Sequence, residues 1–186
     1  IMTAVPRLYE TIHTRMRLGL AKQKPLQQKL FAETLRLGLK RHKEGQRLTL
    51  WERIKDWVLE RLVRSKVRQR FGGRLKAFVS GGAALNPDIG WFFQAMGLTL
   101  LQGYGQTESS PVVSANRPQL VKMPSVGPAL AGVTVRIAED GEILVQGELV
   151  MQGYWRGPRT TPTAIPRGRV QTGEDGPDPF AAPIFF

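Results

Sequence analysis

The stretch LTLLQGYGQTE, residues Leu98 to Glu108, passes from an apolar run into a glycine-rich polar turn. This order predicts a buried strand that ends in a tight loop, because glycine allows backbone conformations and close approaches that other residues do not. The loop carries an aromatic face at Tyr104, a hydroxyl at Thr107 and a carboxylate at Glu108. These groups suit stacking on a base, a phosphate oxygen and a magnesium ion. A single loop of this kind is more often a plain turn, so its interpretation depends on its neighbours.

A second glycine loop, Gly81-Gly82-Ala83, follows the apolar run LKAFVS at residues 75–80. Asn86 and Pro87 then predict a helix start, and Gly97 predicts its end just before the next strand. Strand, loop, helix and strand within about thirty residues predict a right-handed parallel crossover. Both glycine loops would then leave the carboxyl ends of parallel strands, where open α/β sheets bind their ligands. This geometry favours a nucleotide site.

The N-terminal third predicts helices and carries most of the positive charge. The formal net charge is +12, and lysine and arginine concentrate before residue 77. Apolar residues recur at helical spacing between Val5 and Gly45, with Pro25 at the start of a second helix. The sequence from Thr49 to Phe71 predicts a third helix, with Thr49 and Glu52 as its capping box.

Two interpretations of these basic helices stay open. One is an amphipathic surface that binds nucleic acid or an anionic membrane. The other is a solvated helical face packed on a larger body, which we favour because few aromatic residues interleave the basic ones in the first two helices. Trp51 belongs to a helical stripe with Ile54, Val58 and Leu62, and Trp57 lies beside this stripe. We expect both tryptophans to be core anchors.

The sequence after the second glycine loop indicates strands as far as Trp155, and beyond that residue it has no helical or strand periodicity. VTVRIAEDGEILVQGELVM, residues 133–151, alternates around Asp140-Gly141, a strong hairpin signal. Past Trp155 the prolines multiply, and we expect a poorly ordered or truncated tail. The predicted fold class is α/β: part of a parallel-sheet domain, preceded by basic amphipathic helices and followed by a small antiparallel hairpin region. The expected segments are residues 1–72, 73–130, 131–155 and 156–186.

Composition excludes several classes of site. The chain has no cysteine, so disulfides, thiolate metal sites and cysteine nucleophiles are excluded. Its two histidines, His13 and His42, both lie in basic helical sequence, which makes a histidine metal centre or catalytic triad improbable. We find no apolar run of transmembrane length and no signal peptide. We therefore expect a cytoplasmic location, with peripheral contact at the inner face of the membrane as the alternative, and expect no nucleic-acid partner.

Four motifs together resemble the adenylate-forming ligases, and most closely the long-chain fatty acid–CoA ligases. They are VPRLYE at 5–10, SGGAAL at 80–85, QGYGQTE at 102–108 and DGEILVQGELVMQGYW at 140–155. The resemblance implies a two-step reaction. A fatty acid carboxylate attacks the α-phosphate of magnesium ATP to give an acyl-adenylate and pyrophosphate, and coenzyme A then displaces AMP.

The resemblance also implies individual roles. Thr107 would contact the α-phosphate, Glu108 would bind magnesium, and Tyr104 would pack on adenine. The backbone around the nucleotide would come from the two glycine loops: Gly81, Gly82 and Ala83 in one, and Gly103, Gly105 and Gln106 in the other. Glu174, in the run RVQTGE at 169–174, stands where the family has an aspartate that holds the ribose hydroxyls, and its side chain is longer by one methylene.

The family's phosphate loop and C-terminal lid have no counterpart in this sequence. We therefore expect a central fragment of the large N-terminal domain that is inactive by itself. A noncatalytic remnant of the fold stays open as an alternative. The sequence also leaves open the acyl chain length, the oligomeric state, and whether the acceptor is coenzyme A or a carrier protein.

Overall fold

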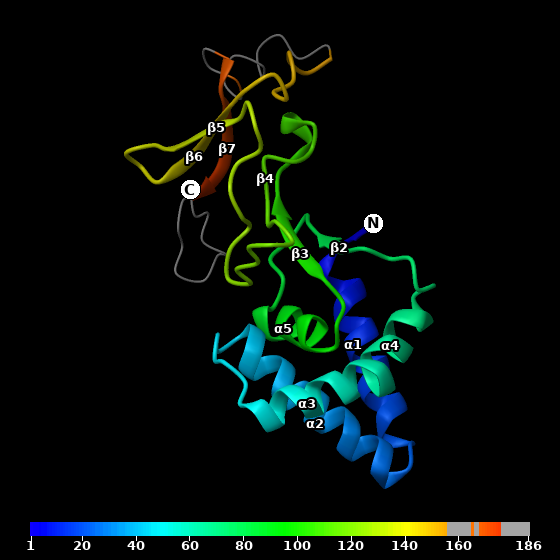
Figure 1. Cartoon of the computed structure of the whole chain (residues 1–186). Helices are drawn as coiled ribbons and strands as arrows, with labels where there is room; N and C mark the ends of the chain where they lie inside the picture. Colours follow the sequence, from blue (N-terminus) through cyan, green and yellow to red (C-terminus); the bar gives the residue numbers. More distant parts are fainter. Residues whose placement is uncertain (156–164, 166–167, 176–186) are drawn as a thin grey trace. The chain divides into compact units, whose positions relative to one another are not determined.

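The computed structural model describes residues 1–155, 165 and 168–175, and the chain divides into two compact units. The first unit comprises Ile1–Leu101, and the second begins at Gln102. The two units are described separately, with their elements labelled in Figure 1.

The first unit is a set of helices packed against short strands. Pro6, Pro25 and Pro87 each stand at the start of a helix, where a missing N–H costs nothing. The helices and strands are α1 (Pro6–Ala21), α2 (Pro25–His42), α3 (Leu50–Leu59), η1 (Glu60–Arg64), α4 (Ser65–Arg70), α5 (Pro87–Ala95), β1 (Met2–Ala4), β2 (Phe78–Ser80) and the start of β3 (Leu100–Tyr104).

The predicted capping box at Thr49 and Glu52 is confirmed. The Glu52 N–H donates to Thr49 Oγ1 at 3.4 Å, and the Thr49 N–H donates to Glu52 Oε2 at 3.0 Å. The helix that begins here runs to Arg70, but it contains a π-helical turn, η1, which the sequence pattern did not indicate.

The expectation that Trp51 and Trp57 anchor the core is wrong. Their side chains are 74% and 60% exposed. The buried face of this helix instead carries Leu59, Val67 and Arg64, and Arg64 is only 5% exposed. Its guanidinium pairs with Asp56 Oδ1 at 2.7 Å, and its Nε donates to the Ala95 carbonyl at 2.8 Å. The buried side of the helix therefore combines apolar residues with a paired cation, and Trp51 and Trp57 lie outside it.

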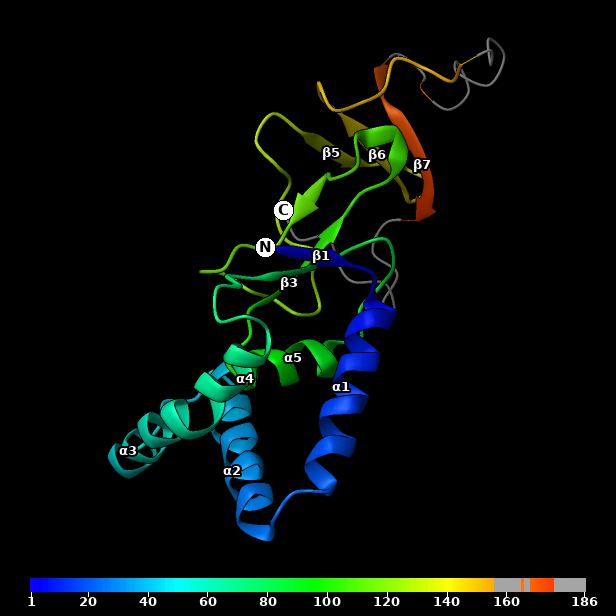
Figure 2. The ribbon, with the colours of Figure 1, turned by 90° about the vertical axis from the view of Figure 1, so that its right-hand side faces the viewer.

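The core of the first unit is built on aromatic residues. Tyr9, Phe78 and Phe93 meet edge to face, with ring centroids 5.6 to 6.0 Å apart. Burial raises the pKa of Tyr9 to about 12, and its hydroxyl donates to the Val79 carbonyl at 2.9 Å. Figures 1 and 2 both place α5 between the strands and α2. Gly38 of α2 permits this packing, since a Cβ there would lie 2.5 Å from the Ala95 Cα.

The predicted order of strand, glycine loop, helix and strand is confirmed. β1 pairs with β2 in parallel, with Met2 opposite Phe78. The Phe78 N–H donates to the Thr99 carbonyl at 2.8 Å, which brings β2 beside the start of β3. The predicted cap of α5 also forms, because Asn86 Oδ1 accepts from the Asp88 N–H at 2.9 Å.

The second unit contains antiparallel strands. The end of β3 pairs with β4 (Ser114–Ala115), and between them lies the 3₁₀ turn η2 (Thr107–Ser109). A three-stranded sheet follows, made of β5 (Thr134–Ile137), β6 (Glu142–Gln146) and β7 (Val170–Asp175). A small apolar core includes Val113, Val145 and Val170, all essentially without exposure.

The predicted hairpin at Asp140-Gly141 is confirmed by the antiparallel pairing of β5 with β6. Gly141 has a φ of +92°, which favours glycine at this turn. β7 falls in the segment that was expected to lack a pattern, so that expectation does not hold for Val170–Asp175. Residues 156–164, 166–167 and 176–186 of this segment lie outside the described residues. In the described part of the chain, every helix is too short or too polar to cross a membrane.

Candidate functional site

The first glycine loop follows β2 in the first unit, and the space beside its second glycine is unfilled. Gly82 has a φ of +80°, and a Cβ built on it would have no neighbour within 4 Å. The Gly81 N–H donates to the Ala4 carbonyl at 3.3 Å, which ties the start of the loop to β1. The hydroxyl of Ser80, the last residue of β2, is buried and has no hydrogen-bond partner among the described residues. The loop therefore offers open space beside a buried polar group.

The second glycine loop leaves β3 in the second unit and is tightly folded. The Val113 N–H donates to the Tyr104 carbonyl at 2.8 Å. A Cβ on Gly105 would lie 1.9 Å from the Pro111 carbonyl oxygen, so the backbone itself fills the space beside this residue. The chain then turns through η2, whose start is closed by the Gln106 N–H donating to Ser109 Oγ at 3.2 Å.

Two side chains of this turn are placed to meet a ligand. Thr107 is exposed at the first position of η2. The side-chain nitrogen of Gln106 is buried, and within the described residues it has no hydrogen-bond acceptor. A buried amide donor without a partner is costly, and a phosphate or a base edge could supply the missing acceptor. This observation fits a nucleotide at the turn.

Glu108 is held by a segment far away in sequence. The Tyr154 hydroxyl donates to Glu108 Oε1 at 2.7 Å, and the Met151 N–H donates to the Glu108 carbonyl at 2.9 Å. The Tyr154 hydrogen bond holds the pKa of Glu108 below its ordinary value, and the same bond raises the pKa of Tyr154. Glu108 is therefore a carboxylate at neutral pH.

This carboxylate fits a magnesium ion that arrives with a nucleotide. Among the residues that the structure describes, no three His, Asp or Glu side chains gather as a metal cluster. Magnesium bound to a nucleotide does not require such a cluster, since one or two carboxylates and the substrate phosphates complete its oxygen ligands.

The predicted site residues are divided between the two units. One continuous stretch of the second unit, from the end of β3 into η2, contains Gly103, Tyr104, Gly105, Gln106, Thr107 and Glu108. Gly81, Gly82 and Ala83 belong to the first unit, so their meeting with that turn around one ligand stays a prediction. Glu174 lies in β7, and its side chain is outside the described part of the structure.

Sequence reasoning assigned no role to Met151 or Tyr154. Both stand in MQGYW, residues 151–155, the end of the fourth motif that resembles the family. The resemblance was the only signal at these positions. Their contacts with Glu108 span 43 and 46 residues, and no local pattern reports a contact at that range.

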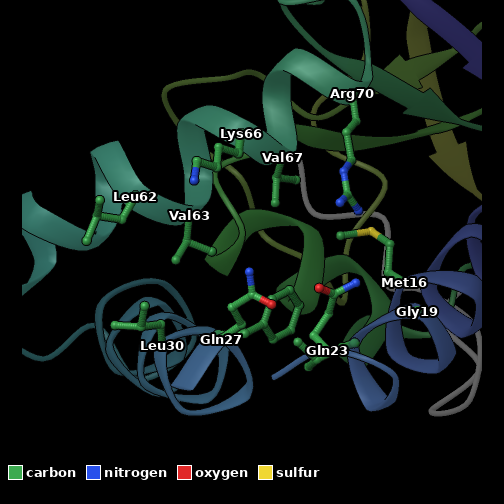
Figure 3. Close-up of a pocket in the computed structure, with 12 residues that line it drawn as sticks. Met16, Gly19, Gln23, Gln27, Leu30, Leu62, Val63, Lys66, Val67 and Arg70 are labelled. Atoms are coloured by element: carbon green, nitrogen blue, oxygen red, sulfur yellow. The ribbon is translucent and has the colours of Figure 1, made fainter. Parts of the chain in front are cut away.

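A separate cavity of about 330 Å³ lies in the first unit among α1, α2, η1 and α4 (Figure 3). Its wall combines apolar side chains, including Met16, Leu30 and Val63, with the cations of Lys66 and Arg70. None of the residues that the sequence predicted as site residues lines it.

The sequence and the fold both match known proteins. Residues 1–155 match the family described as AMP-binding enzyme. The chain is 42% identical over 124 residues to the long-chain-fatty-acid–CoA ligase FadD15 of Mycobacterium bovis, an alignment that covers 67% of this chain and 21% of that protein. It is 32% identical over 180 residues to the putative fatty-acid–CoA ligase fadD11 of Mycobacterium tuberculosis, covering 92% of this chain and 31% of that protein.

Among solved structures, apo MatB from Rhodopseudomonas palustris resembles the chain with a TM-score of 0.53 and 31% identity. That match covers 62% of this chain and 25% of MatB. The chain thus spans between about a fifth and a third of the length of these relatives. The family match extends over most of the chain and includes both glycine loops and the MQGYW motif. The chain belongs to the AMP-binding enzyme family.

Proposed function

We propose that the chain is part of an ATP-dependent acyl–CoA ligase that activates a fatty acid. Two relatives with which it shares 42% and 32% identity are named as fatty-acid–CoA ligases, which supports this substrate class. The observation that carries the proposal is the turn at residues 106–108. There a buried amide nitrogen without a partner among the described residues is followed directly by a hydroxyl and an ionised carboxylate.

The proposed chemistry has two steps. A carboxylate oxygen of the fatty acid attacks the α-phosphorus of ATP, and pyrophosphate leaves. The thiol of coenzyme A then attacks the acyl carbonyl, and AMP leaves. Magnesium, when bound, would neutralise the charge on the phosphate oxygens.

Each residue of the turn has a separate task in this proposal. Glu108 would hold the magnesium ion, and the Thr107 hydroxyl would donate to an oxygen of the α-phosphate. Tyr104 would pack against the adenine ring. Such catalysis depends mainly on positioning and on electrostatic stabilisation of the phosphate, which suits a turn whose backbone is tightly held.

The experiment is carboxylate-dependent exchange of pyrophosphate into ATP by the full-length enzyme. We expect Glu108→Gln to lower the exchange rate about 100-fold, because the developing phosphate charge loses its metal-binding carboxylate. Glu148→Gln is the matched control, since Glu148 is an exposed carboxylate of the same unit, and it should stay within about twofold of wild type. Unchanged exchange in Glu108→Gln would remove the assignment.

The 186-residue chain tested by itself should give no exchange. The sequence motifs account for one part of the nucleotide site, and the chain spans only about a fifth of its relative from M. bovis. Robust exchange by the isolated chain would mean that the groups needed for adenylation are all present within it.

A second proposal, peripheral contact with an anionic membrane, has an observation of its own. The outer face of α3 and the start of η1 carries exposed apolar side chains: Leu50, Trp51, Ile54, Trp57, Val58 and Leu62. The Arg61 guanidinium lies 4.7 Å from the centroid of the Trp57 ring, and Arg53 and Lys55 are exposed on the same helix. Tryptophan beside cationic residues is typical of helices that lie in a membrane interface.

Vesicle binding by the full-length enzyme tests this contact. We expect binding to phosphatidylglycerol vesicles that weakens as salt rises and falls about tenfold in Trp51→Ser/Trp57→Ser. Trp155→Ser is the control, because Trp155 is exposed but lies in the second unit. Equal binding by the double variant and the control would contradict the contact.

A further inference from the structure

Glu108 is tied at two points to the segment that follows β6. One tie is the backbone bond from the Met151 N–H, at 2.9 Å from the Glu108 carbonyl oxygen. The other is the side-chain bond from the Tyr154 hydroxyl, at 2.7 Å from Oε1. The first tie places the Cα of Glu108, and the second orients its carboxylate.

We propose that Tyr154 is a positioning residue that presents the Glu108 carboxylate to magnesium. This inference rests on the proposed function, in which Glu108 is the metal-binding residue. It adds a residue to which neither the sequence motifs nor the comparisons assign a role.

The hydrogen bond has the geometry that this role needs. A carboxylate has two oxygens, each able to accept more than one bond, so a phenol on Oε1 leaves Oε2 available to a cation. A glutamate side chain otherwise samples several rotamers, and a bond to a distant segment selects one of them. Outer partners of this kind orient metal-binding groups in many proteins.

The surroundings of the pair set the size of the effect. Tyr154 is 42% exposed, so water competes with its hydrogen bond. The loss of an outer partner typically weakens metal binding by about 10- to 100-fold. Because Tyr154 is partly exposed, we expect its loss to weaken metal binding by the lower end of this range, about tenfold.

The test measures how much a divalent metal strengthens nucleotide binding to the full-length enzyme. The probe is a nonhydrolysable ATP analogue, whose dissociation constant is measured by calorimetry with and without Mn²⁺. The variant is Tyr154→Phe, which removes only the hydroxyl. The matched control is Trp155→Phe, which alters the neighbouring aromatic residue.

We expect Tyr154→Phe to lower the metal-dependent gain in affinity about tenfold while the affinity without metal is unchanged. In the exchange assay, the Mg²⁺ concentration at half-maximal rate should rise by about the same factor, and the rate at saturating Mg²⁺ should stay within about twofold. Trp155→Phe should match wild type in all of these measurements.

Other outcomes separate the inference from the proposed function. If Glu108→Gln loses the metal-dependent gain and Tyr154→Phe keeps it, Tyr154 is not a positioning residue. If Tyr154→Phe weakens binding equally with and without metal, its role is structural and the inference is wrong. If Glu108→Gln itself keeps the full gain, Glu108 does not bind the metal, and the proposed function fails together with the inference.

Discussion

The two glycine loops use glycine for different physical reasons. Gly82, after β2, has a φ of +80° and open space where a Cβ would be. Gly105, after β3, has a φ outside the left-handed region, but a Cβ there would overlap the Pro111 carbonyl. The first loop needs glycine for its backbone conformation, whereas the second needs it because another part of the backbone occupies the space. Two similar glycine motifs therefore form two kinds of loop. We call the first the open loop, because the space beside Gly82 is empty, and the second the wedged loop, because the Pro111 carbonyl fills the space beside Gly105.

The largest effect should come from Gly105→Ala. The added methyl carbon would lie 1.9 Å from the Pro111 carbonyl oxygen, and backbone cannot move aside as the end of a side chain can. We expect the free energy of unfolding to fall by about 3 kcal/mol, the upper part of the range for an overpacked site. Urea unfolding followed by circular dichroism measures this change.

Gly19→Ala is the control for the Gly105 measurement. Gly19 lies in α1 with no atom within 4 Å of a built Cβ, so alanine should raise stability by about 0.8 kcal/mol through helix propensity. A cost below 1 kcal/mol for Gly105→Ala would mean that the second loop can relax, and the contrast between the loops would disappear.

The next effect tests what anchors the wedged loop. Asn116 is buried, its side-chain nitrogen lies within hydrogen-bond distance of the Ser125 carbonyl, and its Oδ1 accepts from the Lys122 N–H at 3.0 Å. Its backbone N–H also donates to the Gln102 carbonyl at 2.9 Å, next to the start of the loop.

Asn116→Ala should lower the free energy of unfolding by about 2 kcal/mol, because several buried backbone groups lose their partners. Asn116→Asp keeps the acceptor for Lys122 but places a buried carboxylate against backbone carbonyl oxygens, so it should cost at least as much as alanine. A cost below about 0.5 kcal/mol for Asn116→Ala would mean that the hydrogen bonds of this side chain are not what holds the segment.

A smaller effect is expected at Gly82. Alanine there meets no neighbour but must adopt a left-handed conformation, which costs about 1.5 kcal/mol. Gly82→Asn should cost less, since asparagine enters this region more readily. Thermal unfolding measures the loss of stability in both variants. Equal losses for Gly82→Ala and Gly82→Asn would mean that the left-handed backbone conformation is not the cause.

The sequence could predict those features that depend on neighbouring residues. The capping box at Thr49, the cap at Asn86 and the hairpin at Gly141 all follow from local hydrogen bonding and backbone preferences. The glycine loops were found for the same reason. The resemblance to a family added roles for Thr107 and Glu108, which their chemistry alone left open.

Features that depend on tertiary contacts were not predictable in this way. Trp51 and Trp57 have the spacing of a core face, yet both lie outside. Leu59, Val67 and the ion pair of Arg64 with Asp56 occupy the inner side. The bond between Tyr154 and Glu108 joins residues 46 positions apart. Neither periodicity nor a local motif can report which side of a helix has a partner or which distant side chain reaches a carboxylate.

The smallest effect concerns the anchor of the open loop. Asn86 is exposed and caps α5 through one bond to the Asp88 N–H at 2.9 Å, so Asn86→Ala should cost about 1 kcal/mol and Asn86→Gly only a few tenths. Urea unfolding of both variants beside Asn116→Ala measures the difference between the two anchors. A cost at Asn86 as large as the cost at Asn116 would mean that both loops are held equally firmly. The expected twofold difference would instead show that the exposed cap at Asn86 contributes less to stability than the buried hydrogen bonds of Asn116.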